Sequence, residues 1–353
     1  MAKSLGARIT AAALLYLLLA ALMAISCCLG FVEIPLSRLM EILAHAAGLS
    51  PALPDPAQAA IVMDVRMPRI AAAALVGGTL AVSGTVFQAL LLNPLADPYT
   101  LGISSGAAFG ASMAIVLSIL GLPIPQAAGI PVLAFVGAAG SLLAVLFLSA
   151  GPANGTATPG GGGFSSTSLI LAGVIVSAIL SAAIGFMKFL ADEQVGAIIF
   201  WLMGSLSGIY WHQVALLAIV SLPALVIVQL LGRELNIAAT GEKSALSLGI
   251  DTARLRLILL TLCSLWTAVA VSVSGIIGFV GLIVPHLLRH VIGPDNRLLA
   301  AASFPAGAIL LLSADTLTRA VLPAEVPIGV LTALIGGPVF CMIFRRHQAG
   351  RGF

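Results

Sequence analysis

Few residues in this sequence combine a reactive side chain with a spacing that could support chemistry. His286 and His290 are four residues apart, so on a helix both imidazoles would face one way, as two ligands of a metal ion do. A helix end beside Arg289 explains the same pair without a metal, and we favour that interpretation. Asp315 and Arg319 have the same spacing and can pair along one helix face. With no nucleophile–base pair or metal cluster in the sequence, we expect no catalytic residue, no metal site and no cofactor.

The stretch Gly241-Glu242-Lys243-Ser244 looks like a fragment of a phosphate-binding loop. In the G-x-x-x-x-G-K-[ST] pattern the second glycine directly precedes the lysine. Here Glu242 separates the two, and no upstream glycine has the required spacing. We therefore expect that the chain does not bind ATP by itself.

The same stretch lies in the largest polar interruption of the sequence, residues 233–256. Apolar residues recur on both sides of Gly241, in a pattern that a disordered linker would lack. The pattern predicts two short amphipathic helices hinged at Gly241-Glu242. A folded projection of this kind, on a chain without an ATP site, suggests docking to a separate cytoplasmic protein.

The composition of the chain indicates an integral membrane protein. Of its 353 residues 60% are hydrophobic and 8% are charged, whereas a soluble domain has about 25% charged residues. The net charge is only +3 and no basic block occurs, which excludes a nucleic-acid-binding protein. The four cysteines lie in apolar stretches and read as small core residues.

The distribution of charges predicts about ten membrane spans in an all-α fold. Residues 98–187 contain no charge, and a span needs roughly 20 apolar residues, so this stretch alone holds several crossings. Residues 257–288 would form a helix of roughly 48 Å, too long for one crossing, and we expect a break within 272–278 and a second part interrupted at Pro285. The remaining expected elements are spans at 9–30, 70–92, 101–120, 127–150, 168–190, 213–231, 298–320 and 328–344, and an interfacial helix at 195–206.

The basic residues predict the orientation of these spans. An even number of spans places both termini on one side, and with the termini inside, eleven basic and five acidic residues fall on the inner side. The basic ones are Lys3, Arg8, Arg233, Lys243, Arg254, Arg256, Arg289, Arg297, Arg345, Arg346 and Arg351, and the acidic ones are Asp97, Glu234, Glu242, Asp251 and Asp295. Because an excess of Lys and Arg marks cytoplasmic loops, we expect both termini in the cytoplasm.

Several short motifs follow one another between residues 60 and 345. They are Arg66-Met67-Pro68-Arg69, Ser83-Gly84, Asn93-Pro94-Leu95-Ala96-Asp97-Pro98, Leu101-Gly102-Ile103-Ser104-Ser105-Gly106-Ala107, Phe200-Trp201-Leu202-Met203-Gly204-Ser205, Ala239-Thr240-Gly241-Glu242, Gly275-Ile276-Ile277-Gly278-Phe279-Val280-Gly281-Leu282-Ile283-Val284-Pro285-His286, Ala314-Asp315 with Arg319, and Gly336-Gly337-Pro338. In this order they resemble the motifs of the FecCD-type permeases, a family of permease subunits of bacterial ABC importers for iron–siderophore complexes, haem and vitamin B12.

The resemblance implies a single transmembrane permease domain over residues 1–353, similar to the vitamin B12 permease, in the bacterial inner membrane. It implies a homodimer with a second copy of the chain, cytoplasmic ATP-binding subunits that supply ATP hydrolysis, and a periplasmic or lipid-anchored substrate-binding protein. Membrane lipid would surround the helices. The cargo would be a metal chelate, with an iron–siderophore complex as the default and haem or cobalamin as close alternatives.

The resemblance also implies roles for particular residues. Gly241 and Glu242, in the coupling loop 233–256, match the segment that inserts into the ATPase. Thr167 and Ser168 match the cytoplasmic gate, although Ser165 to Ser168 can also cap a helix. Arg66, Arg69 and Arg319 match arginines that receive the binding protein. Alternatively, Asp64 neutralises Arg66 and Asp315 neutralises Arg319. A stand-alone secondary carrier of a small solute is the other function that the sequence leaves open.

Overall fold

The structure is a computed structural model that describes residues 5–49, 55–150, 165–321 and 325–349, and every regular element in these ranges is a helix. Seven helical stretches are long and apolar enough to span a membrane, and three shorter apolar helices accompany them, which together make up the ten predicted. The ten helices are α1 (Leu5–Cys28), α4 (Met67–Leu90), α5 (Ile103–Ile119), α6 (Gln126–Ser149), α7 (Ser166–Ala191), α9 (Trp211–Leu230), α12 (Thr252–Ser274), α13 (Val280–Ile292), α14 (Asn296–Ala320) and α15 (Ile328–Ala349).

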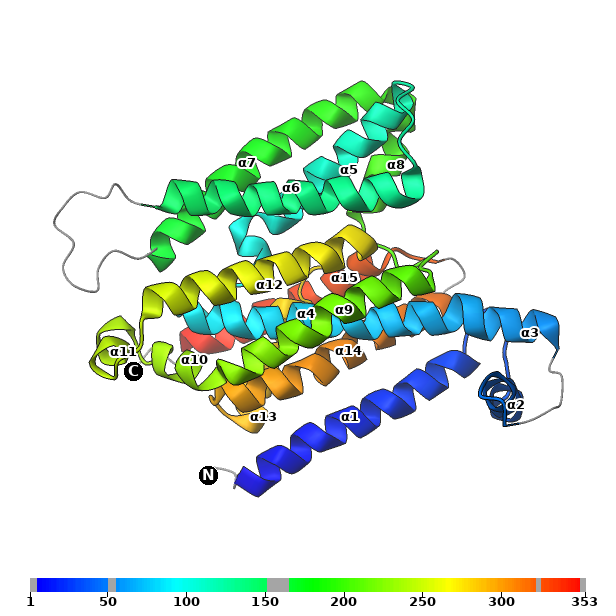
Figure 1. Ribbon diagram of the computed structural model, residues 1–353, viewed down its shortest axis with the longest axis horizontal. Coiled ribbons are helices and arrows are strands. Elements are labelled where there is room, and N and C mark those ends of the chain that lie inside the picture. The colour runs from blue at the N-terminus through cyan, green and yellow to red at the C-terminus, as the bar shows by residue number, and fades with distance from the viewer. Residues whose placement is uncertain (1–4, 50–54, 151–164, 322–324, 350–353) are drawn as a thin grey trace.

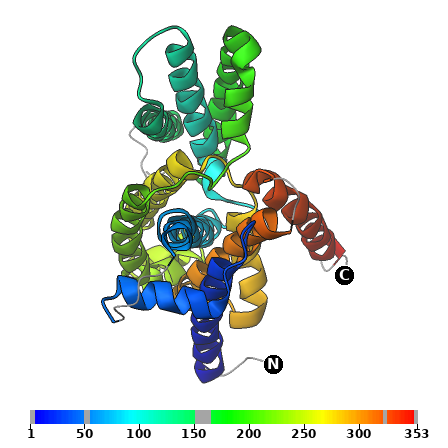
Figure 2. The same ribbon diagram turned by 90° about the vertical axis from the view of Figure 1, so that its right-hand side faces the viewer.

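Helix α4 lies at the centre of the larger part of the molecule, and most of its residues are buried. Helices α1, α9, α12, α13 and α14 surround it, as the end-on view shows (Figure 2). Helices α5, α6 and α7 and the short helix α8 (Val195–Leu202) form a second group on one side (Figure 1). The helix predicted at 195–206 is present as α8, although it ends earlier, at Leu202.

Helix α14 packs against α4 closely enough for the two backbones to touch. A Cβ atom built on Gly77 would collide with the carbonyl oxygen of Gly307, and one built on Gly307 would collide with that of Gly77. Small residues allow this approach between membrane helices, where packing rather than hydrophobic burial drives association. The pair therefore fixes α14 along the central helix.

The chain breaks between α12 and α13, within the predicted range. Helix α12 ends at Ser274, and Gly275 and Phe279 both have positive φ before α13 begins at Val280. The expected interruption at Pro285 is wrong, because this proline lies inside α13. Proline leaves the carbonyl four residues earlier, on Gly281, without its helical donor. The Gln88 side-chain amide lies 3.4 Å from that oxygen and 3.2 Å from the Leu282 oxygen, and it donates to both.

Two elements before α4 were not predicted. Helix α2 (Leu36–Ala46) buries Leu39 and Ile42, and helix α3 (Pro56–Ala60) with a π-helical turn (Ile61–Arg66) extends α4 toward its N-terminal side. The Asp55 carboxylate caps this extension by accepting from the Ala57 N–H at 3.0 Å.

The bundle has two ends that carry different features (Figure 1). The arginine end carries Arg66 and Arg69 near the start of α4 and Arg319 near the end of α14. The hinge end carries the short helices α10 (Gly232–Ala238) and α11 (Glu242–Ser247). The described start of α1 and the described end of α15 both lie at the hinge end, as an even number of spans requires.

Candidate functional site

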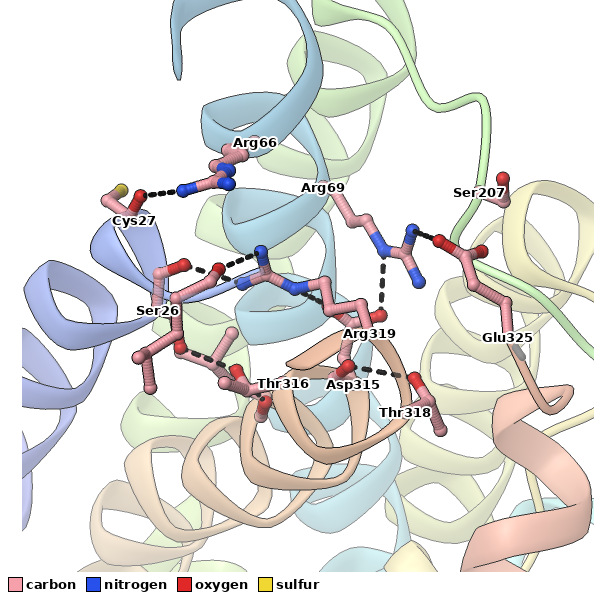
Figure 3. A network of polar contacts seen from close by, with 12 residues as sticks. Ser26, Cys27, Arg66, Arg69, Ser207, Asp315, Thr316, Thr318, Arg319 and Glu325 are labelled. Carbon is pink, nitrogen blue, oxygen red and sulfur yellow. Dashed lines mark hydrogen bonds and ion pairs between the residues drawn. The ribbon is translucent and has the colours of Figure 1, made fainter. Parts of the chain in front are cut away.

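At the arginine end, Asp315 joins α4 to α14. Its carboxylate accepts from Arg69 Nε at 2.8 Å and from Arg319 Nε at 3.2 Å, and its side chain is only 1% exposed (Figure 3). Arg69 also pairs with Glu325 at 3.1 Å, and the Glu325 side chain is 38% exposed. Asp315 is therefore a buried anchor for two guanidinium groups, whereas Glu325 is a second, more exposed partner of Arg69.

Arg319 and Arg66 both bind the C-terminal end of α1. Arg319 donates to the Ser26 and Leu29 carbonyls at 2.7 and 2.9 Å. Arg66 donates to the Cys27 carbonyl at 2.6 Å, and further to those of Cys28 and Val32. The last carbonyls of a helix lack intrahelical donors. Both arginines therefore cap α1 and fix it to α4 and α14.

These contacts test the two ion pairs, Asp64–Arg66 and Asp315–Arg319, that the sequence left open. Asp315 does pair with Arg319, as one alternative held. Asp64 is exposed and forms none of the described ion pairs of the chain, so Arg66 is held by backbone carbonyls rather than by that carboxylate. Carbonyl oxygens leave the guanidinium charge in place, because they carry no net charge.

All three arginines line one hollow at this end. The hollow has a volume of about 170 Å³, and Glu325 and residues 30–32 also contribute to its wall. Guanidinium groups are always charged and suit bidentate recognition of carboxylates. A carboxylate that enters this hollow would meet three guanidinium groups. Among the described residues, only Arg69 of the three pairs with an exposed carboxylate of the chain itself, that of Glu325.

At the hinge end, the structure confirms two short helices joined at Gly241. This glycine has φ +110° and ψ 154°, a region that side-chain-bearing residues essentially do not occupy. Nothing lies within 4 Å of a Cβ atom built there, and Glu242 is exposed, so the corner projects freely. Helix α12 begins at Thr252, so the last residues of the polar stretch 233–256 already belong to this helix. Asp251 caps α12 by accepting from the Arg254 N–H at 3.0 Å.

The predicted gate residues lie at the start of α7. Ser165 caps this helix by accepting from the Ser168 N–H at 3.1 Å, as the capping alternative expected. Thr167 and Ser168 are exposed in the first turn.

A cavity of about 240 Å³ lies between the start of α7 and the hinge. Ser165, Ser166 and Thr167 line one side, and Ala238, Glu242, Thr252 and Arg256 line the other. A movement of α10 and α11 would therefore change the surroundings of the α7 start directly.

Metal-binding clusters are not found among the described residues. No group of three or more His, Cys, Asp or Glu side chains converges there. The His286 and His290 rings lie edge to face with their centroids 5.3 Å apart on α13.

The sequence did not indicate two partners that the structure reveals. Glu325 reaches Arg69 from a segment 256 residues away in sequence, and Asn236 on α10 contacts the start of α14. Neither residue belongs to a periodic pattern, so only the folded chain brings these contacts to light.

Comparisons with known proteins agree with this architecture. The model of the FecCD transport family matches residues 2–346. A cobalamin import system permease of Halobacterium salinarum is 41% identical over 307 residues, which cover 87% of this chain and 79% of the relative. A hemin transport system permease of Yersinia pestis is 39% identical over 291 residues, covering 82% and 84%.

Two further relatives cover nearly the whole chain. An uncharacterized ABC transporter permease of Bacillus subtilis is 40% identical over 341 residues, which cover 95% of this chain and 93% of the relative. A solved structure, an inward-facing conformation of an ABC transporter assigned to the metal-chelate type, matches with a TM-score of 0.79 and 32% identity over 94% of this chain and 97% of that one. With helices, hinge and arginines in this arrangement and a family match over residues 2–346, the chain belongs to the FecCD transport family of membrane-spanning ABC permeases.

Proposed function

We propose that this chain is the permease subunit of an ABC importer that moves a metal chelate into the cytoplasm. The observation that carries the proposal is the family match over residues 2–346, with relatives described as cobalamin and hemin permeases. An iron–siderophore complex is the default cargo, and two relatives in Helicobacter pylori are described as probable iron chelatin permeases. Haem and cobalamin remain the other two cargoes to test.

In this proposal two copies of the chain enclose the path, and ATP is hydrolysed on separate subunits at the hinge end. The Gly241–Glu242 corner inserts into a groove of the ATPase. Its free projection and its exposed carboxylate suit contact with a basic groove. The hinge end is then cytoplasmic, and so are both termini, in line with the excess of basic residues on that side.

The cavity between the hinge and the start of α7 supports a gating role for Thr167 and Ser168. A shift of α10 and α11 on ATP binding would be passed to α7 across this cavity. Small hydroxyl side chains would then close or open a narrow exit between the two subunits. The chain needs no catalytic group of its own for this cycle.

On the opposite side, Arg66, Arg69 and Arg319 receive a periplasmic or lipid-anchored binding protein. Acidic side chains of that protein would enter the hollow that the three arginines line. Glu325 is more than a third exposed and holds Arg69 through a pair of low expected strength, so an incoming carboxylate can replace it.

Transport in vesicles tests the proposal. We expect uptake only when the ATPase subunits and ATP are present, and a stand-alone carrier would instead transport without them. A binding titration of the partner binding protein against an iron–siderophore complex, haem and cobalamin identifies the cargo.

A further inference from the structure

Residues at the end of α9 and along α10 form hydrogen bonds with the first turns of α14. The Asn236 side chain donates to the Asp295 carboxylate at 2.8 Å and accepts from the Asn296 N–H at 2.7 Å. Asp295 itself caps α14 by accepting from the Arg297 N–H at 3.0 Å. One side chain of the hinge end thus binds both the capping residue of α14 and its first helical residue.

A second side-chain amide, that of Gln229, also binds the start of α14. The Gln229 side chain, with its amide oriented to satisfy both groups, donates to the Arg297 carbonyl at 3.2 Å and accepts from the Ala301 N–H at 3.0 Å. Between Gln229 and Asn236, a Cβ atom on Gly232 would lie 3.0 Å from the Arg297 Cβ, so the two backbones are close. Gln229 lies on α9, and Gly232 and Asn236 lie on α10, so both helices contact the start of α14.

Helix α14 links this contact to the arginine end. Its 25 residues extend over roughly 37 Å at 1.5 Å per residue. Near its far end lie Asp315 and Arg319, which hold Arg69 of α4 and the carbonyls of α1. A single continuous helix therefore has the hinge bound at one end and the arginine network at the other.

We propose that Asn236 is a positioning residue that makes α14 move with α10, so that docking at the arginine end and ATP hydrolysis at the hinge end are coupled through α14. The inference rests on the proposed function, because it assigns partners to the two ends. The proposed contact lies outside the Gly241–Glu242 corner. The corner contacts the ATPase, and Asn236 transmits the displacement of α10 to α14. We call Asn236, Asp295 and Asn296 the α14 latch.

A pair of substitutions can break and restore the latch. Asn236→Asp removes the amide donor and places two carboxylates against each other, which is unfavourable at hydrogen-bond distance. Asn236→Asp combined with Asp295→Asn exchanges the two groups. The new amide donates to the new carboxylate, the carboxylate still accepts from the Asn296 N–H, and asparagine still caps α14. Asp295→Asn alone is the matched control, since it keeps an oxygen that accepts from both Asn236 and the Arg297 N–H.

The measurement is ATP hydrolysis by the complex with its ATPase subunits in proteoliposomes, with and without the binding protein, together with uptake per ATP. For Asn236→Asp we expect unchanged assembly and basal hydrolysis within twofold of the wild type. Stimulation by the binding protein should fall roughly fivefold or more, the size of effect that a contact energy in the usual range produces. The exchanged double variant should recover to within twofold, and so should Asp295→Asn.

Two results would overturn the latch. One is stimulation of Asn236→Asp equal to that of the wild type. The other is a double variant as impaired as the single one, which would show that the loss comes from a disturbed fold. If Asn236→Asp does not assemble, Asn236→Ser, which is too short to reach Asp295, is judged by the same criteria. Failure of the proposed function is distinguishable, because the wild-type complex would then show no ATP-driven uptake.

Discussion

Arg69 on α4 and Asp315 on α14, 246 residues apart in sequence, are joined by a contact of 2.8 Å between Nε and Oδ1. The same carboxylate also accepts from Arg319, whose remaining donors cap α1. The Asp315 carboxylate and its two arginines therefore connect α1, α4 and α14. The arginines assigned to docking are therefore preorganised by the fold rather than placed loosely on a surface.

Replacing Asp315 with Asn should destabilise the chain. Removing one partner of a buried pair leaves an uncompensated charge and costs about 3–5 kcal/mol, and we expect the lower part of this range because Arg69 keeps Glu325. Thermal unfolding of the purified chain in detergent measures the effect. Glu41→Gln is the matched control, because it breaks the Arg38–Glu41 pair, in which both side chains are at least half exposed and which contributes about 1 kcal/mol or less. Equal effects of the two substitutions would contradict the anchoring role of Asp315.

Replacing Glu325 with Gln should speed docking of the binding protein. The substitution removes the exposed carboxylate that competes for Arg69, so an incoming acidic side chain meets less repulsion. Arg69→Glu should have the opposite effect, and so should Arg66→Glu if its buried site tolerates the change. Association rates across a salt series measure both, with the largest differences at low ionic strength, where screening is weakest. The arginines have no docking role if all variants associate like the wild type at every salt concentration.

Replacing Gly241 with Ala should uncouple ATP hydrolysis from uptake. The space for a methyl group exists, but the observed φ and ψ are accessible essentially to glycine alone, so a side chain costs about 1–3 kcal/mol or bends the corner. Uptake per ATP in vesicles is the measurement. Ser244→Ala, at an exposed position of α11, is the control and should couple normally. Normal coupling in Gly241→Ala would show that the corner tolerates a different shape.

Cysteines introduced at Thr167 or Ser168 should crosslink between two subunits, to an extent that depends on the bound nucleotide. Both residues are exposed in the capped first turn of α7, where a small movement changes their separation from a second copy. The native exposed Cys341 is first replaced with Ser, and that protein without a new cysteine serves as the control. If neither position crosslinks in any nucleotide state, the gate lies elsewhere.

Helices and their breaks could be predicted from the sequence because hydrophobicity and charge are local signals. The uncharged stretch 257–288 predicted a break that the structure places between Ser274 and Val280, and the recurring apolar residues around Gly241 predicted two helices with a hinge. Helix α2 was missed because, at 11 residues, it is too short to stand out as a span.

The errors came from contacts between residues far apart in sequence. Pro285 lies inside α13 without ending it, and the Gln88 amide of α4 donates to the Gly281 carbonyl that lacks a helical donor. Asp64, although only two residues from Arg66, does not pair with it, because the end of α1 offers carbonyls to that arginine. A sequence pattern cannot reveal a partner that lies on another helix. The latch between Asn236 and Asp295 is hidden for the same reason.

The central claim is that this chain moves its cargo only when a separate ATPase drives it. The most direct measurement is uptake of the identified chelate into proteoliposomes that contain the chain with its ATPase subunits, with the binding protein outside and ATP on the ATPase side. We expect uptake that stops when ATP is replaced by a non-hydrolysable analogue, and no uptake by the chain alone under an ion gradient. Uptake by the chain alone, without the ATPase subunits, would contradict the account.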